Sequence, residues 1–195
     1  QEIPGYPLSV DAYDPREVAK LPRYCIHTQH FRDRVPDGNN KAIIDAWYER
    51  MGQVFHAMHH YCWGLMKTNR AVLLARDPAI RRFYLADAIS EYDYVIRHAS
   101  DDFLLLPEIL TKKGENLVRL DKGPLAVLEF ERARALKRDY WPPYAHLSDY
   151  YRRIGEVPRA RATLTEGLEA APDATALRRR LAELDADDTR RRTKP

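Results

Sequence analysis

Apolar residues recur every three or four positions over most of the chain, which is the period of an amphipathic helix. The clearest segment runs from 107 to 172, where the pattern repeats after 34 residues. Small residues in one copy align with small residues in the other, and large apolar residues align with large ones. The aligned pairs are Gly114 with Ser148, Leu117 with Tyr151, Ala126 with Ala160, Phe130 with Leu164, and Ala133 with Gly167. Each copy holds two helical stripes, so we predict two helical hairpins here.

This repeat resembles the tetratricopeptide repeat (TPR). The second copy matches the family pattern at Tyr144, Leu147, Ser148, Tyr151, Ala160, Leu164, Gly167 and Pro172. The first copy matches at Leu110, Gly114, Leu117, Ala126, Phe130 and Ala133. It departs at Lys113, where the family prefers Leu, and at Arg138, where it prefers Pro. The resemblance implies an all-α, helical-hairpin solenoid, and flanking helices must complete it because two repeats cannot bury their apolar stripes alone.

The sequence predicts four regions along the chain. Residues 1–40 contain five prolines, which exclude long helices, and several tyrosines, which indicate an arm packed on the helical body. Residues 41–100 predict divergent helical hairpins, with a break near Gly52 and a helix that begins at Asp77–Pro78 and ends near His98. Residues 101–187 hold the TPR-like repeats and a C-terminal capping helix whose N-cap is Asp173. Residues 188–195 predict a basic tail that is frayed.

The divergent region contains residues suited to the TPR packing positions. Gly64 fits the small position of a first helix, and Tyr92 fits the large position of a second helix. The spacing between these two helices is longer than in the clear repeats. We therefore expect helical pairing there without the regular repeat geometry.

Composition narrows the function classes. The chain has 195 residues, of which 45% are apolar, so it can bury a substantial core. Its net charge of +3 comes from interleaved acidic and basic residues and gives no reason to expect nucleic acid or an anionic membrane as a partner. No apolar run is long enough for an integral membrane segment. Phosphate-binding loops and the common hydrolase motifs are absent from the sequence, so we expect no enzymatic activity.

The two cysteines, Cys25 and Cys62, lie outside the clear repeats. We predict that they form a disulfide, because an even number of cysteines is typical of exported proteins. Disulfides persist in oxidising compartments, so we expect a periplasmic or extracellular location. The sequence begins with Gln1, which leaves open whether a leader has been removed or the sequence has been trimmed.

Five of the seven histidines lie close to these cysteines in the sequence: His27, His30, His56, His59 and His60. On a helix, His56 shares a face with His59 or His60, and two such imidazoles can bind a transition metal. One interpretation is a site for copper, zinc or haem. If the cysteines are bonded, neither is a thiolate ligand, and the histidines pack and donate hydrogen bonds around the disulfide. We expect no cofactor and keep the metal or haem site as the alternative.

The TPR resemblance implies a groove lined by the first helix of each repeat, which takes an extended peptide or a partner helix. Helical periodicity places these residues on that face: Glu108, Thr111, Glu115, Arg119, Asp149, Arg152 and Arg153. The family's Lys and Asn clamp for a terminal carboxylate is absent, because Thr111, Glu115, Ala145 and Asp149 occupy its positions. The mixed charge suits a protein segment of complementary charge, although it is also typical of a solvated surface. We predict a non-catalytic scaffold or adaptor that binds a protein partner, or its own copies as a homo-oligomer.

Overall fold

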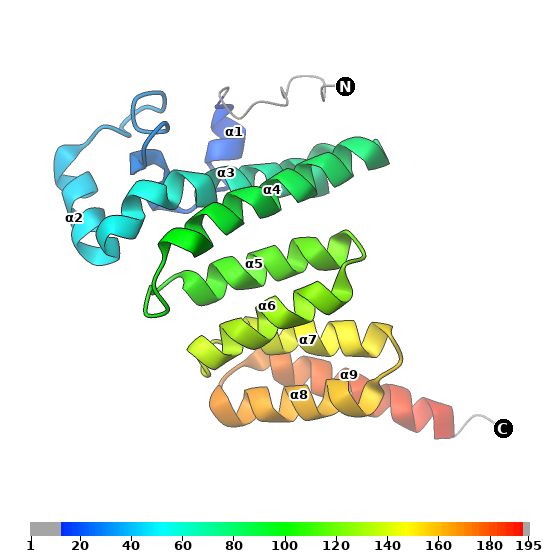
Figure 1. Ribbon diagram of the computed structural model, residues 1–195. Helices are drawn as coiled ribbons and strands as arrows, with labels where there is room; N and C mark the ends of the chain where they lie inside the picture. Colours follow the sequence, from blue (N-terminus) through cyan, green and yellow to red (C-terminus); the bar gives the residue numbers. More distant parts are fainter. Residues whose placement is uncertain (1–12, 193–195) are drawn as a thin grey trace.

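The computed structural model describes residues 13–192, and this range contains helices and no β-strand. Consecutive antiparallel helices stack into an elongated body (Figure 1). The pairs are α3 (Met58–Asn69) with α4 (Pro78–His98), α5 (Leu106–Arg119) with α6 (Gly123–Leu136), and α7 (Pro142–Arg153) with α8 (Val157–Ala170), followed by α9 (Thr175–Arg192). The predicted all-α solenoid of TPR-like hairpins is confirmed. No helix in the described range is long and apolar enough to cross a membrane.

Residues before α3 form short helical elements. They are α1 (Pro15–Val18), the 3₁₀ helix η1 (Arg23–His27), α2 (Lys41–Met51) and the 3₁₀ helix η2 (Gly52–Ala57). The break near Gly52 occurs as predicted, because this glycine adopts φ 63°, a left-handed conformation that ends α2. Asp77 caps α4 by accepting hydrogen bonds from the backbone N–H groups of Ala79 and Ile80. A π-helical segment, η3 (Arg70–Leu74), extends α3 and lengthens the first hairpin.

Close contacts between small and large residues hold the hairpins together. A Cβ atom at Gly64 of α3 would collide with the Tyr92 ring of α4, and one at Gly114 of α5 would collide with the Phe130 ring of α6. Both rings are fully buried. The divergent first hairpin therefore packs in the same way as the regular one, despite its longer helices.

The ion pairs of Lys113 explain why the chain has a lysine where the TPR pattern prefers leucine. Its Nζ lies 2.7 Å from Asp93 of α4 and 2.6 Å from Glu129 of α6. The lysine thus connects three helices through ion pairs at a position where the family uses apolar packing.

The arm packs on α3 (top of Figure 1), and its Cys25 forms the predicted disulfide with Cys62. Tyr24 and Phe31 are buried in the same core as α3, as expected for an arm that lies on the body. Tyr6 lies outside the described residues. Glu17 of α1 and Arg70 of η3 form a buried ion pair with 2.7 Å between Oε1 and Nε. The disulfide joins residues 37 positions apart, so its loss would cost about 3–4 kcal/mol of stability.

Two predictions about the C-terminal end are wrong. The last helix starts at Thr175, so Asp173 lies in the preceding turn and its side chain is fully exposed. The expected basic tail is helical as far as Arg192. Arg161 of α8 forms ion pairs with Asp185 and Asp188, which hold this part of α9 against α8 and let the helix continue.

We predict that Gly114→Ala lowers the free energy of unfolding by about 1–2 kcal/mol, because the added methyl group displaces the Phe130 ring. Urea denaturation followed by circular dichroism measures this loss. Ser148→Ala is the control, since it adds no atom at the equivalent position of the next repeat. A double variant with Phe130→Leu should be less destabilised than the sum of the single variants, and strict additivity would contradict the proposed contact.

Candidate functional site

The first helices of the hairpins form a continuous face. Helix α5 contacts α7, and α7 contacts α9, in addition to the contacts within the hairpins and between α4 and α5. We call the surface made by α5, α7 and α9 the first-helix face. It corresponds to the surface on which the sequence predicts a binding groove.

A pocket of about 260 Å³ opens on this face between α5 and α7. Helix α5 contributes Glu115, Val118 and Arg119, and α7 contributes His146, Asp149, Tyr150 and Arg153. Phe130 of α6 completes the lining, and its ring stacks on the His146 imidazole with 5.4 Å between centroids. The pocket therefore combines an aromatic floor with charged walls.

Glu115 organises the charges of the pocket. Its carboxylate lies 2.9 Å from Lys112 Nζ, 3.3 Å from Arg119 Nη2 and 3.3 Å from His146 Nε2. Burial alone would raise the pKa of the Glu115 carboxyl, but the hydrogen bond from His146 and the charge of Lys112 outweigh it and lower that pKa to about 2. Glu115 is therefore a permanent negative charge that orients Arg119.

Ion pairs also connect α7 with α9. Asp149 accepts hydrogen bonds from Arg180, with 2.9 Å between Oδ2 and Nη2. Arg152 pairs with Asp187 and approaches Glu183. Arg153 lies over the Tyr150 ring, 5.5 Å from its centroid, and no described acidic side chain forms an ion pair with it.

The structure brings together four of the seven residues predicted for the groove: Glu115, Arg119, Asp149 and Arg153. The other three lie elsewhere. Glu108 accepts a hydrogen bond from the Tyr61 hydroxyl of α3, and Arg152 points to α9. Thr111 is buried and donates its hydroxyl hydrogen to the Pro107 carbonyl of its own helix.

Val118 of α5 is an apolar residue of the lining, and sequence reasoning missed three other residues that line the pocket. His146 and Tyr150 lie three and four residues from other pocket residues on α7, so their helical spacing could have identified them. Phe130 could not be found in this way, because it belongs to the second helix of its hairpin and reaches the face through the gap at Gly114.

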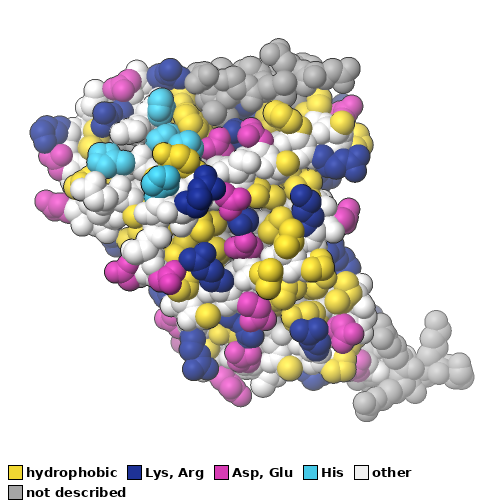
Figure 2. All heavy atoms as spheres, viewed as in Figure 1, with side chains coloured by type: hydrophobic (Ala, Val, Ile, Leu, Met, Phe, Trp, Pro, Cys, Tyr) yellow, Lys and Arg dark blue, Asp and Glu magenta, His cyan; other side chains and the backbone are white. Residues whose placement is uncertain are grey.

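Histidine side chains gather at the end of the molecule that carries α2 (Figure 2), whereas His146 lies in the pocket on α7. Ring centroids are 4.8 Å apart for His30 and His59, 4.2 Å for His59 and His60, and 3.7 Å for His60 and Tyr94. His27 donates a hydrogen bond from Nδ1 to the Gly38 carbonyl, and the exposed His56 lies at the edge of the Tyr48 ring. No three His, Cys, Asp or Glu side chains within the described residues are arranged to hold a metal ion. The geometry does not favour the metal or haem alternative.

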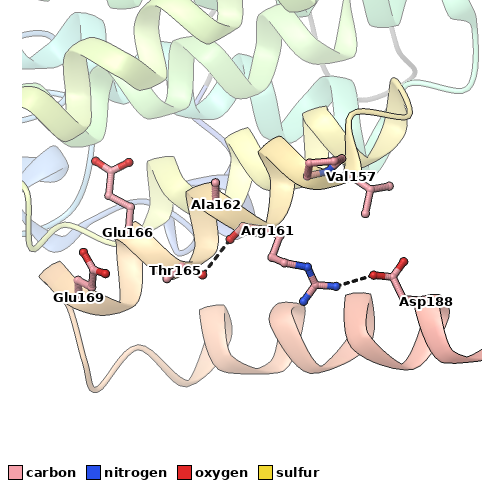
Figure 3. A pocket seen from close by; sticks show the side chains of 8 residues that line it. Val157, Arg161, Ala162, Thr165, Glu166, Glu169 and Asp188 are labelled. Carbon is pink, nitrogen blue, oxygen red and sulfur yellow. Dashed lines mark hydrogen bonds and ion pairs between the residues drawn. The ribbon is translucent and has the colours of Figure 1, made fainter.

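A wider hollow of about 670 Å³ lies between α8 and α9 (Figure 3). Val157, Pro158, Ala162 and Thr165 form its α8 side, and Glu166 and Glu169 lie at one end. Arg161 crosses the hollow to Asp188. Carboxylates outnumber cations here, so this hollow is acidic and contrasts with the pocket between α5 and α7.

Comparison with protein-family models and with curated proteins finds no match for this chain. Among solved structures, the chain is similar to the first TPR of Spaghetti (RPAP3), solved bound to the HSP90 peptide SRMEEVD. The two share 16% sequence identity with a TM-score of 0.46, over 66% of this chain and 95% of the other. The likeness is too distant to assign a partner.

We predict that acid weakens the fold through His59, which is 7% exposed. Burial, together with the nearby His60 and His30, lowers the pKa of its imidazole to about 4. The unfolded chain binds the proton near pH 6.5, so stability is complete above that pH and declines as the pH falls toward 4. Partial solvent screening limits the loss to about 1–2 kcal/mol.

Urea denaturation at pH 7.5 and pH 4.5 measures this dependence. His59→Gln should flatten the difference between the two pH values, and His56→Gln, an exposed neighbour, should preserve it. If His59→Gln keeps the full difference in stability between the two pH values, other titrating groups cause that difference.

Proposed function

We propose that this chain is a non-catalytic scaffold or adaptor that works outside the cytoplasm and holds a protein partner, or further copies of itself, on the first-helix face. The observation that carries the proposal is the pocket between α5 and α7, an open hollow with charged walls and an aromatic floor. Its volume of about 260 Å³ accommodates one or two side chains, which suits an extended protein segment better than a large cofactor.

The charged groups favour binding over acid–base chemistry. A general acid or base works best with a pKa near the operating pH, and the Glu115 carboxyl has a pKa of about 2. Asp149 is held by Arg180, and Arg119 is held by Glu115 and Asn116. Fixed charges of this kind give electrostatic complementarity to a partner and select among partners.

The disulfide supports a location outside the cytoplasm, because such bonds persist in oxidising compartments. Cys25 and Cys62 are both fully buried, so their disulfide is shielded from exchange with other thiols, as expected of a structural bond.

A photo-crosslinking residue tests the binding face. We expect p-benzoylphenylalanine at Val118, in the pocket, to form a covalent adduct with the partner in the native host. The same residue at Leu128, which is 65% exposed on α6, is the matched control and should form none. The mass of the adduct separates a different protein from a second copy of this chain. Adducts from Leu128 alone would contradict the proposed face.

Thiol labelling tests the compartment. In cells quenched with acid and unfolded in the presence of a maleimide, we expect both cysteines to resist labelling until a reductant is added. Cys25→Ser should then expose one reactive thiol at Cys62, which provides the positive control. Full labelling of the wild-type chain without reductant would place it in a reducing compartment.

A further inference from the structure

The charges of the pocket between α5 and α7 leave Arg153 without a matching carboxylate. The charged residues of the lining are Glu115, Asp149, Arg119 and Arg153. Glu115 pairs with Arg119 and with Lys112, and Asp149 pairs with Arg180, which lies outside the lining. Both carboxylates are therefore paired without Arg153, whose charge favours a negatively charged ligand group.

Arg153 is the group most available to that ligand. Its side chain is exposed and lies over the Tyr150 ring, which keeps the guanidinium beside the pocket. It forms no ion pair with a described side chain, whereas Arg152, the preceding residue, is paired with Asp187 and Glu183 on α9. A ligand can bind Arg153 without displacing an internal partner.

Arg119 supplies the opposite wall. Its Nη1 donates a hydrogen bond to Asn116, and its Nη2 lies 3.3 Å from Glu115. These contacts leave donors of the guanidinium for a ligand, because an arginine has five N–H donors. The Tyr150 ring, which is half-buried, suits an apolar side chain next to the charged one. A carboxylate fits better than a doubly charged phosphate, since Glu115 and Asp149 would repel the larger charge.

We propose that this pocket binds an internal acidic side chain, flanked by an apolar residue, in an extended segment of the partner, with Arg153 and Arg119 as the groups that bind its carboxylate. The inference rests on the proposed function and names the chemistry of its partner. The ligand group is a side chain within the segment, so the site does not depend on a free C-terminus.

Selection from a random 12-residue peptide library displayed on phage tests this inference. The peptides are fused through their C-terminal ends and offer no terminal carboxylate. We expect the wild-type chain to select peptides rich in Asp or Glu beside an apolar residue. A selected peptide, synthesised with both ends capped, should lose at least about tenfold in affinity for Arg153→Gln or Arg119→Gln, since each change removes a charge-assisted hydrogen bond.

The controls separate charge from fold. Arg132→Gln removes a cation from α6, outside the pocket, and should leave the affinity unchanged. Replacing the acidic residue of the peptide with its amide should cost as much as Arg153→Gln, and the two changes together should cost little more than either alone.

The outcomes are distinguishable. Peptides without an acidic preference, or peptides whose binding is insensitive to both arginine variants, overturn this inference and leave the scaffold proposal standing. Failure of the wild-type chain to select any peptide counts against the scaffold proposal itself. Acidic peptides that depend on Arg153 and Arg119, with Arg132→Gln unaffected, establish the site.

Discussion

The close approach of helices at glycine determines the structure of this chain. Gly64 admits Tyr92 between α3 and α4, and Gly114 admits Phe130 between α5 and α6. Gly167 of α8 does the same, since a Cβ atom there would lie 2.7 Å from Leu177 of α9 and 2.8 Å from Tyr144 of α7. These contacts fix the distance between helices. Phe130 also forms part of the pocket, so the packing that builds the hairpin also shapes the candidate site.

Internal ion pairs fix most of the charges on the first-helix face of the unbound chain. Glu115 is buried enough to make its ion pairs strong, and it holds Arg119 in position. Asp149 and Arg152 are tied to α9 and stabilise the stack. Arg153 is the exception, since its internal contact is with an aromatic ring and its charge is available. Binding at a pre-organised pocket of this kind costs little conformational entropy.

Much of the fold could be predicted from the sequence, and the site only in part. The 34-residue period and the pattern of small and large residues identify the hairpins, and the cysteine count suggests the disulfide. Helical spacing found Glu115, Arg119, Asp149 and Arg153. It also placed Glu108 and Thr111 on the same face, although neither lines the pocket. Helical spacing does not show which neighbouring element covers a side chain. The prediction of a frayed tail was wrong because it rested on the run of arginines alone. Asp185 and Asp188 form ion pairs with Arg161, and these hold α9 against α8.

The N-terminal arm and α3 lie close to the start of α5, whereas the pocket lies at the C-terminal half of α5. The disulfide links the arm to α3. Burial raises the pKa of the Tyr24 hydroxyl on the arm, and the nearby Glu108 charge adds to this shift. Tyr61 of α3 donates its hydroxyl hydrogen to the same carboxylate. The arm and α3 thereby occupy the surface around Glu108, at the start of α5. The pocket lies farther along α5, from Glu115 to Arg119, so the proposed binding of a partner is limited to the region where Arg119 and Arg153 lie.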